Sequence, residues 1–212
     1  MWWRHRGARF LAMRDWEECY RAGETPWDKG GAAPPLGEVI ERCGKALWGS
    51  GPVLVPGCGV GHDVRALAAL GIPVLGLDIA QGAVERARAF PPSGCETYEV
   101  GDFLEPSWCE GRHFSAIWEH TCFCAIDRAL RGNYVESAAA LLAAGEVLAG
   151  VFFLTPNDPG DEESGPPFNV SIEELEERFS PWFERIEAWV PQRTYPGREG
   201  REWVGVFRRR AG

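Results

Sequence analysis

The chain has 212 residues, of which 45% are hydrophobic and 25% charged, and its formal net charge is −9 at pH 7. This length suits one α/β domain with a full core, so we expect a single domain over residues 1–212. No apolar run approaches the roughly twenty residues that span a bilayer, which argues against a membrane protein. The acidic balance argues against a nucleic-acid partner, because phosphates usually require a basic face.

The N-terminal sequence lacks the apolar segment of a secretory signal. Residues 1–12 are expected to form a flexible extension, and the natural start is either Met1 or Met13. The seven cysteines are expected to be reduced in a cytoplasmic protein. Cys122 and Cys124 form a close pair without a second pair or a histidine at ligand spacing, so no metal site is expected.

Short apolar runs between turn residues predict five strands, followed by two more near the C-terminus. They lie at residues 53–55, 74–77, 97–100, 115–118, 151–154, 183–190 and 202–207. Helical patterns fall between the first five strands, at residues 64–70, 82–89 and 134–144, which predicts a parallel sheet. A capping box from Ser171 to Glu174 predicts a helix that ends at Phe179. The last two strands are joined by a turn, so we expect the final strand to be antiparallel.

The turn after the first strand has the glycine pattern Gly57-x-Gly59-x-Gly61. A dinucleotide site usually has Gly-x-Gly-x-x-Gly, but here His62 replaces the third glycine and Asp63 adds a negative charge near a pyrophosphate. S-adenosylmethionine has no phosphate and needs close approach to the backbone, which glycine permits. The pattern therefore favours S-adenosylmethionine. An NAD-dependent oxidoreductase and a non-catalytic binding protein remain as alternatives.

Residues that follow the strands supply the candidate ligand contacts, because ligands of open α/β sheets bind at the carboxyl ends of the strands. Asp78 is expected to accept hydrogen bonds from ribose hydroxyls, and Asp102 from the adenine amino group. Phe103 can offer its amide and its ring beside the base. The fourth strand is followed by residues 119–123, which include His120, instead of the motif of enzymes that methylate base amines, in which an acidic residue or asparagine precedes two prolines and an aromatic residue. This is a second argument against nucleic acid.

Five segments, read in order, carry a resemblance to a known family: Trp16–Tyr20, Thr25–Gly30, Val55–Asp63, Phe123–Asp127 and Gly165–Phe168. They resemble the thiopurine S-methyltransferase superfamily and, within it, the thiol, thiocyanate and halide methyltransferases. The resemblance implies a class I S-adenosylmethionine-dependent methyltransferase of Rossmann-like fold, with a seven-stranded, mostly parallel sheet and an N-terminal lid over residues 13–45. It implies cofactor contacts by Trp16, Tyr20, Trp27, Gly57, Asp78, Asp102, Phe103 and His120. Tyr20 stands where a tryptophan is common in the family, and His120 where a tyrosine is common.

The expected activity is methyl transfer to a small thiol or anion, such as an alkyl thiol, hydrosulfide, thiocyanate or halide. A larger heteroaromatic thiol, as in thiopurine methylation, is the second choice. The faces of Trp16, Tyr20 and Trp27 would attract the sulfonium cation, although rings of this kind also simply pack on a sheet. His120 is the candidate base for a thiol acceptor, or only a cofactor contact. The protein is expected to be a monomer or a weak homo-oligomer.

Overall fold

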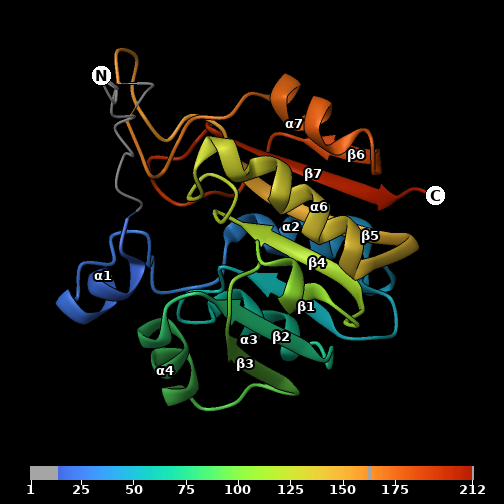
Figure 1. Ribbon diagram of the computed structural model, residues 1–212, viewed down its shortest axis with the longest axis horizontal. Coiled ribbons are helices and arrows are strands. Elements are labelled where there is room, and N and C mark those ends of the chain that lie inside the picture. Colours follow the sequence, from blue (N-terminus) through green and yellow to red (C-terminus); the bar gives the residue numbers. More distant parts are fainter. Residues whose placement is uncertain (1–13, 162–163, 212) are drawn as a thin grey trace, which may run out of the picture.

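A computed structural model of the protein describes residues 14–161 and 164–211, so the predicted extension over residues 1–12 lies outside the described part. A seven-stranded sheet has the order β3-β2-β1-β4-β5-β7-β6 (Figure 1). Its strands are β1 (Val53–Pro56), β2 (Val74–Asp78), β3 (Glu96–Val100), β4 (Phe114–His120), β5 (Leu142–Phe153), β6 (Phe183–Trp189) and β7 (Glu202–Arg209).

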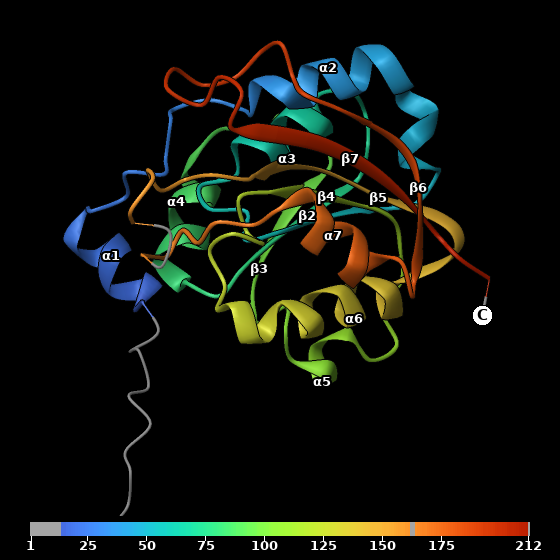
Figure 2. The ribbon, with the colours of Figure 1, turned by 90° about the horizontal axis from the view of Figure 1, so that it is seen from above.

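Helices cover both faces of the sheet (Figure 2). The helical elements are α1 (Trp16–Ala22), α2 (Pro34–Cys43), η1 (Lys45–Trp48), α3 (His62–Ala68), α4 (Gln81–Ala89), α5 (Pro106–Cys109), η2 (Arg128–Leu130), α6 (Arg131–Leu141) and α7 (Ile172–Phe179). Helices α2 and α3 pack on one face of the sheet, and α6 and α7 pack on the other. None of the helices in the described part of the chain is long and apolar enough to cross a membrane.

Strand pairing confirms the predicted parallel sheet and its antiparallel end. Strands β1 to β5 pair in parallel, whereas β7 is antiparallel to both of its neighbours, β5 and β6. In β1, Leu54 faces the core under α6 and α7, while Val53 and Val55 face the core under α2 and α3. A continuous apolar run is what a strand buried on both faces requires. The glycine-rich turn is thus anchored on the centre of the sheet.

The junction between α6 and β5 differs from the sequence-based prediction. The expected helix over residues 134–144 ends at Leu141, and β5 begins at the next residue rather than at Val151. Leu142 pairs with Phe114, and an irregularity follows before Ala116 pairs with Val147. The alanine-rich sequence of residues 138–144 favours a helix locally. Pairing with β4 overrides that preference, because it satisfies backbone groups at the centre of the sheet.

The N-terminal part of the described chain forms two helices with different neighbours. The Asp15 side chain caps α1 by accepting a hydrogen bond from the Glu18 amide at 2.9 Å. Helix α1 packs against α4, where the Gly82 amide donates to the Glu17 carboxylate at 2.9 Å. Figure 1 shows α1 beyond the sheet, at the end to which the arrowheads of the parallel strands point. Helix α2 instead buries Leu36 and Val39 against the sheet.

Candidate functional site

Three glycines shape the turn between β1 and α3. Gly57, Gly59 and Gly61 have φ angles of +60°, +55° and +78°, which favour glycine. A Cβ atom on Gly57 would lie 2.9 Å from the Cβ and Sγ of Cys122, so the loop after β4 packs directly on this turn. A Cβ on Gly61 would lie 2.6 Å from the Tyr98 ring. Packing against Tyr98 therefore explains the glycine at position 61 without a ligand.

Asp78 ends β2 beside the same turn and is 8% exposed. Its Oδ2 accepts a hydrogen bond from the Gly59 amide and its Oδ1 one from the Ala80 amide, each at 2.9 Å. Burial raises the pKa of Asp78, against the opposing effect of these amides. Each carboxylate oxygen can accept more than one hydrogen bond. Asp78 can therefore still receive a diol at the edge of the glycine turn, which is the geometry expected for a ribose contact.

The three aromatic residues of the predicted lid form one group, which we call the aromatic cluster (Trp16, Tyr20 and Trp27). The Trp27 ring lies 5.2 Å from Trp16 and 5.8 Å from Tyr20, in edge-to-face contacts. Trp27 Nε1 donates to the Tyr20 hydroxyl at 3.2 Å, and this hydroxyl lies 3.2 Å from the position of a Cβ on Gly59. The cluster thus adjoins the glycine turn.

A cation already lies on this cluster. The Arg14 guanidinium is 5.5 Å from the ring centroid of Trp16 and 5.1 Å from that of Trp27. These distances are typical of cation–π attraction. The rings therefore offer faces that can hold positive charge beside the glycine turn.

Asp102 and Phe103 follow β3, as expected, but their side chains have local partners. Asp102 Oδ1 accepts a hydrogen bond from the Leu104 amide at 2.8 Å, an arrangement typical of a turn residue. The Phe103 ring is 5% exposed and packs in the core with its centroid 4.8 Å from that of Tyr134. The second oxygen of Asp102 and the amide of Phe103 are the groups that remain for a ligand.

His120 ends β4 and is held by a buried carboxylate. Its Nδ1 lies 2.9 Å from Asp63 Oδ2, an oxygen that also accepts a hydrogen bond from Trp118 Nε1 at 2.8 Å. Leu54 of β1 pairs with Ile117 of β4, and Cys122, two residues after His120, packs on Gly57, so the end of β4 lies beside the glycine turn. His120 Nε2 is buried and has no hydrogen-bond partner among residues 14–161 and 164–211. An unpaired buried nitrogen at this place fits a bound ligand.

Asp63 points away from the glycine turn, which corrects the expectation that its charge lies near a bound pyrophosphate. Its Oδ1 accepts a hydrogen bond from the Ala33 amide at 2.6 Å, and its Oδ2 faces β4. Burial opposes the ionisation of Asp63, but His120, the Trp118 indole and the Ala33 amide together lower its pKa. His62 instead has its Nε2 3.0 Å from Asp28 Oδ1.

Tyr195, in the loop between β6 and β7, completes the surroundings of His120. The two rings are stacked with centroids 6.0 Å apart and an angle of 24°. The Tyr195 hydroxyl donates to the Gly31 carbonyl at 2.6 Å, and burial raises its pKa. Asp63 and Tyr195 thus both bind the chain between α1 and α2.

Sequence reasoning missed the roles of Asp63 and Tyr195. The position of Asp63 could have indicated an inward-facing side chain, because it stands four residues before the apolar Leu67 and so lies on the same face of α3. Tyr195 gave no such signal, since its contacts join segments more than 70 residues apart in the chain.

The cysteines near the site are free thiols. Burial raises the pKa of Cys122 well above its ordinary value, and Glu119 adds to the shift. Cys124 donates to the Thr121 carbonyl at 3.3 Å. In the part of the chain that the structure describes, no group of three or more His, Cys, Asp or Glu side chains could hold a metal ion. These thiols are poor nucleophiles in this environment.

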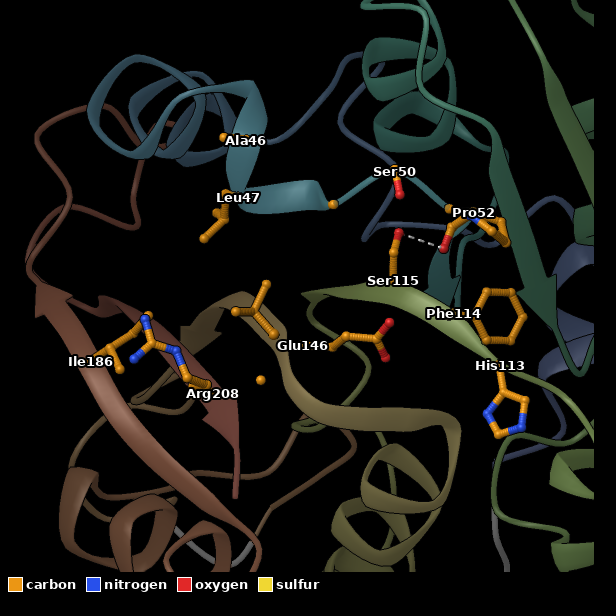
Figure 3. Close-up of a pocket in the computed structure, with 14 residues that line it drawn as sticks. Ala46, Leu47, Ser50, Pro52, His113, Phe114, Ser115, Glu146, Ile186 and Arg208 are labelled. Carbon is orange, nitrogen blue, oxygen red and sulfur yellow. Dashed lines mark hydrogen bonds between the residues drawn. The ribbon is translucent and has the colours of Figure 1, made fainter. Parts of the chain in front are cut away.

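A cavity of about 550 Å³ lies at the other edge of the sheet, where β1 and β4 begin (Figure 3). Two of its polar side chains have partners within the protein: the Ser115 hydroxyl donates to the Trp48 carbonyl at 2.7 Å, and Glu146 accepts from the Ala143 amide at 2.6 Å. Ligands of open α/β sheets bind at the carboxyl ends of the strands. The glycine turn is therefore the candidate functional site, in preference to this cavity.

Comparison with known proteins yields a family and several relatives. The model of the thiopurine S-methyltransferase (TPMT) family matches residues 11–208. Over 200 residues the chain is 34% identical to a probable thiol methyltransferase 2 of Arabidopsis thaliana and 32% identical to thiocyanate methyltransferase 1 of Brassica oleracea. Each alignment covers 92% of this chain and 84% of the relative.

Solved structures show the same fold at low sequence identity. The CcbJ methyltransferase of Streptomyces caelestis has a TM-score of 0.68 at 19% identity, covering 92% of this chain and 96% of that one. A TehB-like SAM-dependent methyltransferase of Corynebacterium glutamicum has a TM-score of 0.63 at 17% identity, covering 91% of this chain and 96% of that one. Both alignments span nearly the whole sheet and its helices, so the fold is that of class I methyltransferases.

Proposed function

Because this chain belongs to the thiopurine S-methyltransferase family and is a methyltransferase, we propose that it methylates the sulfur of a small thiol, or a small anion such as thiocyanate or a halide. The methyl donor is S-adenosylmethionine. The observation that carries this proposal is the position of Asp78, whose carboxylate lies 2.9 Å from the Gly59 amide at the ends of two neighbouring strands. The names of the two plant relatives support the choice of acceptor.

The residues at the glycine turn fit an adenosine that carries a sulfonium. Gly57 and Gly59 let Cys122 and the Tyr20 hydroxyl pack closely against the turn, and Asp78 beside it can accept hydrogen bonds from the ribose hydroxyls. The free oxygen of Asp102 and the amide of Phe103 are assigned to the base. The aromatic cluster is assigned to the sulfonium, because ring faces attract a cation without offering a nucleophile.

When bound, the donor supplies an electrophilic methyl group whose transfer neutralises the positive charge on sulfur. The protein therefore has little new charge to stabilise, and its main tasks are alignment of the acceptor and exclusion of water. In our proposal the segment between α1 and α2 helps to exclude water. It is held next to the site by hydrogen bonds, because the Gly31 carbonyl accepts from Tyr195 and the Ala33 amide donates to Asp63.

A larger heteroaromatic thiol is the second acceptor class. The family model itself is that of thiopurine S-methyltransferase, and a relative 30% identical over 190 residues is named 2-heptyl-1-hydroxyquinolin-4(1H)-one methyltransferase, from Mycobacteroides abscessus. The alignment covers 88% of this chain and 80% of that relative. A thiopurine is therefore one of the acceptors to test.

The proposal is tested by incubating the protein and S-adenosylmethionine with iodide, thiocyanate, sulfide, a short alkyl thiol and a thiopurine in parallel. Gas chromatography of the headspace detects the volatile methyl products, and the absorbance change reports the thiopurine. We expect at least one small acceptor to be methylated faster than the thiopurine. Tight binding of S-adenosylhomocysteine without turnover of any acceptor would indicate a non-catalytic binding protein.

Asp78→Ala tests the cofactor site. Loss of an acceptor for two ribose hydroxyls should weaken S-adenosylhomocysteine binding at least about 100-fold, because hydrogen bonds to a charged group contribute about 1.5–3 kcal/mol each. Isothermal titration calorimetry measures the affinity. Asp158→Ala is the control with the same change of charge, since the Asp158 side chain is 83% exposed. Equal affinities for Asp78→Ala and the wild type would refute the assignment.

A further inference from the structure

The geometry around His120 points to an inference that rests on the proposed function and narrows its acceptor. We propose that Asp63 is a positioning residue: it holds His120 with the proton on Nδ1, so that Nε2 is the base for a neutral thiol. The acceptors then include thiols that are mostly protonated at neutral pH, such as an alkyl thiol or hydrogen sulfide. They are not limited to anions, which need no base.

The tautomer follows from the partners of Asp63. An ionised carboxylate can only accept hydrogen bonds, and the lowered pKa of Asp63 keeps it ionised. Trp118 Nε1 and the Ala33 amide can only donate hydrogen bonds. His120 Nδ1 lies 2.9 Å from Asp63 Oδ2 and must donate as well. A neutral imidazole that donates from Nδ1 has its lone pair on Nε2.

The position of Nε2 fits a base. This nitrogen is buried and has no partner in the described part of the chain, and the end of β4 lies beside the glycine turn, since Cys122 packs on Gly57. Stacking on Tyr195 fixes the plane of the ring. Since Tyr195 donates its own proton to the Gly31 carbonyl, it does not compete for Nε2.

The charged groups around His120 leave Asp63 as its direct ionic partner. Glu119 is the neighbour in the chain but lies on the opposite face of the sheet, where it bonds to Tyr134. Arg198 lies 5.4 Å from the Tyr195 ring and is paired with Glu202 at 3.0 Å. Asp28 on the segment before α2 is bonded to His62.

The reaction balances with these groups. The thiol proton passes to His120 Nε2, and the thiol sulfur forms a bond to the methyl carbon. The electron pair of the broken carbon–sulfur bond stays on the sulfur of the donor, which becomes a neutral thioether. The imidazolium is stabilised by the Asp63 charge until its proton is lost to water. Thiocyanate and halides need no such proton transfer.

The first test measures which nitrogen of His120 carries the proton, in protein without methyl donor or methyl acceptor. Long-range nitrogen–proton NMR spectra distinguish the two neutral tautomers. We expect the His120 signals, assigned by their absence in His120→Gln, to show a protonated Nδ1 and a bare Nε2. A proton on Nε2 in the neutral wild-type protein would overturn the inference, whatever the activity of the enzyme.

The second test compares two kinds of acceptor in the variants Asp63→Asn and His120→Gln. At about pH 7 we expect kcat/KM for an alkyl thiol to fall about 100-fold or more, the usual contribution of a general base. The value for thiocyanate or iodide should change less than about threefold, a small effect on the scale of that contribution. As the pH rises towards about 10 the thiol ionises by itself, so the variants should approach the wild type.

The matched control is His113→Gln, because His113 directly precedes β4 at its other end and is exposed. It should match the wild type with both acceptors. Equal losses of thiol and anion methylation in His120→Gln, at every pH, would overturn the base assignment and indicate a cofactor contact. If Asp63→Asn does not fold, His120→Gln and the wild-type tautomer still decide the question. A wild-type protein that methylates no acceptor refutes the proposed function instead, while the tautomer still tests the pairing with Asp63.

Discussion

At the scale of single residues, Gly57 in the turn after β1 combines a left-handed backbone conformation with a close contact to another segment. Gly57 has a φ of +60°, a conformation that costs other residues about 1–2 kcal/mol. The position of a Cβ on Gly57 is also occupied, because Cys122 comes within 2.9 Å. Two separate costs therefore oppose any side chain here, and the second depends on the loop after β4.

Gly57→Ala should lower the free energy of unfolding by about 2–5 kcal/mol, the backbone cost plus that of overpacking. Gly71→Ala is the matched control: Gly71 has a φ of +73°, but a Cβ there would meet only the Lys45 ammonium at 3.6 Å. It should lose only about 1–2 kcal/mol. Urea unfolding measures the stability of both variants. Equal losses in the free energy of unfolding would show that Cys122 can move aside without an energetic penalty.

At the scale of elements, the docking of α1 on α4 connects the aromatic cluster to the sheet. Glu17 accepts a hydrogen bond from the Gly82 amide, and Arg86 donates to the Tyr20 carbonyl. A Cβ on Gly82 would lie 2.9 Å from Tyr20 Cβ, so α1 can approach α4 this closely only because residue 82 has no side chain. The sequence pattern of α4 predicts the helix but not this contact, because no local periodicity records what packs on a glycine.

Gly82→Ala should push α1 away from α4 and disturb the aromatic cluster. We expect faster deuterium exchange of the α1 amides and S-adenosylhomocysteine binding weakened about tenfold, which corresponds to about 1.4 kcal/mol. Gly132→Ala is the matched control, since Gly132 is also the second residue of its helix and a Cβ there would meet nothing within 4 Å. Unchanged exchange in Gly82→Ala would show that α1 docks without this close approach.

At the scale of the whole molecule, the sheet separates two buried carboxylates that respond to pH in opposite directions. Asp63 lies on the face covered by α2 and α3, and its pKa is lowered despite burial. Glu119 bonds to Tyr134 on the face covered by α6, and burial raises its pKa. A carboxyl whose pKa is lowered in the folded state adds stability when the pH is above its pKa in the unfolded chain. A carboxyl whose pKa is raised in the folded state removes stability as the pH rises through its pKa in the unfolded chain.

Unfolding between about pH 3 and about pH 7 tests these opposite signs. Asp63→Asn should be more destabilising at the upper end of this range, because the stability from ionised Asp63 is lost as the pH falls through its folded pKa. Glu119→Gln should gain on the wild type as the pH rises, because the amide carries no charge to bury. Urea midpoints of both variants measure the differences, and parallel pH curves for the two would contradict the assignments.

The sequence by itself determined the family, the parallel sheet with its antiparallel last strand, and the glycine turn. The sheet and the turn follow from local patterns, namely apolar runs, glycines where φ is positive and an acidic residue at a strand end, whereas the family follows from the resemblance carried by five segments. Tertiary structure decided the start of β5, the burial of the Phe103 ring, and the inward turn of Asp63 towards His120. Each of these depends on a partner distant in the chain, because pairing and burial compensate polar groups only once the sheet has formed.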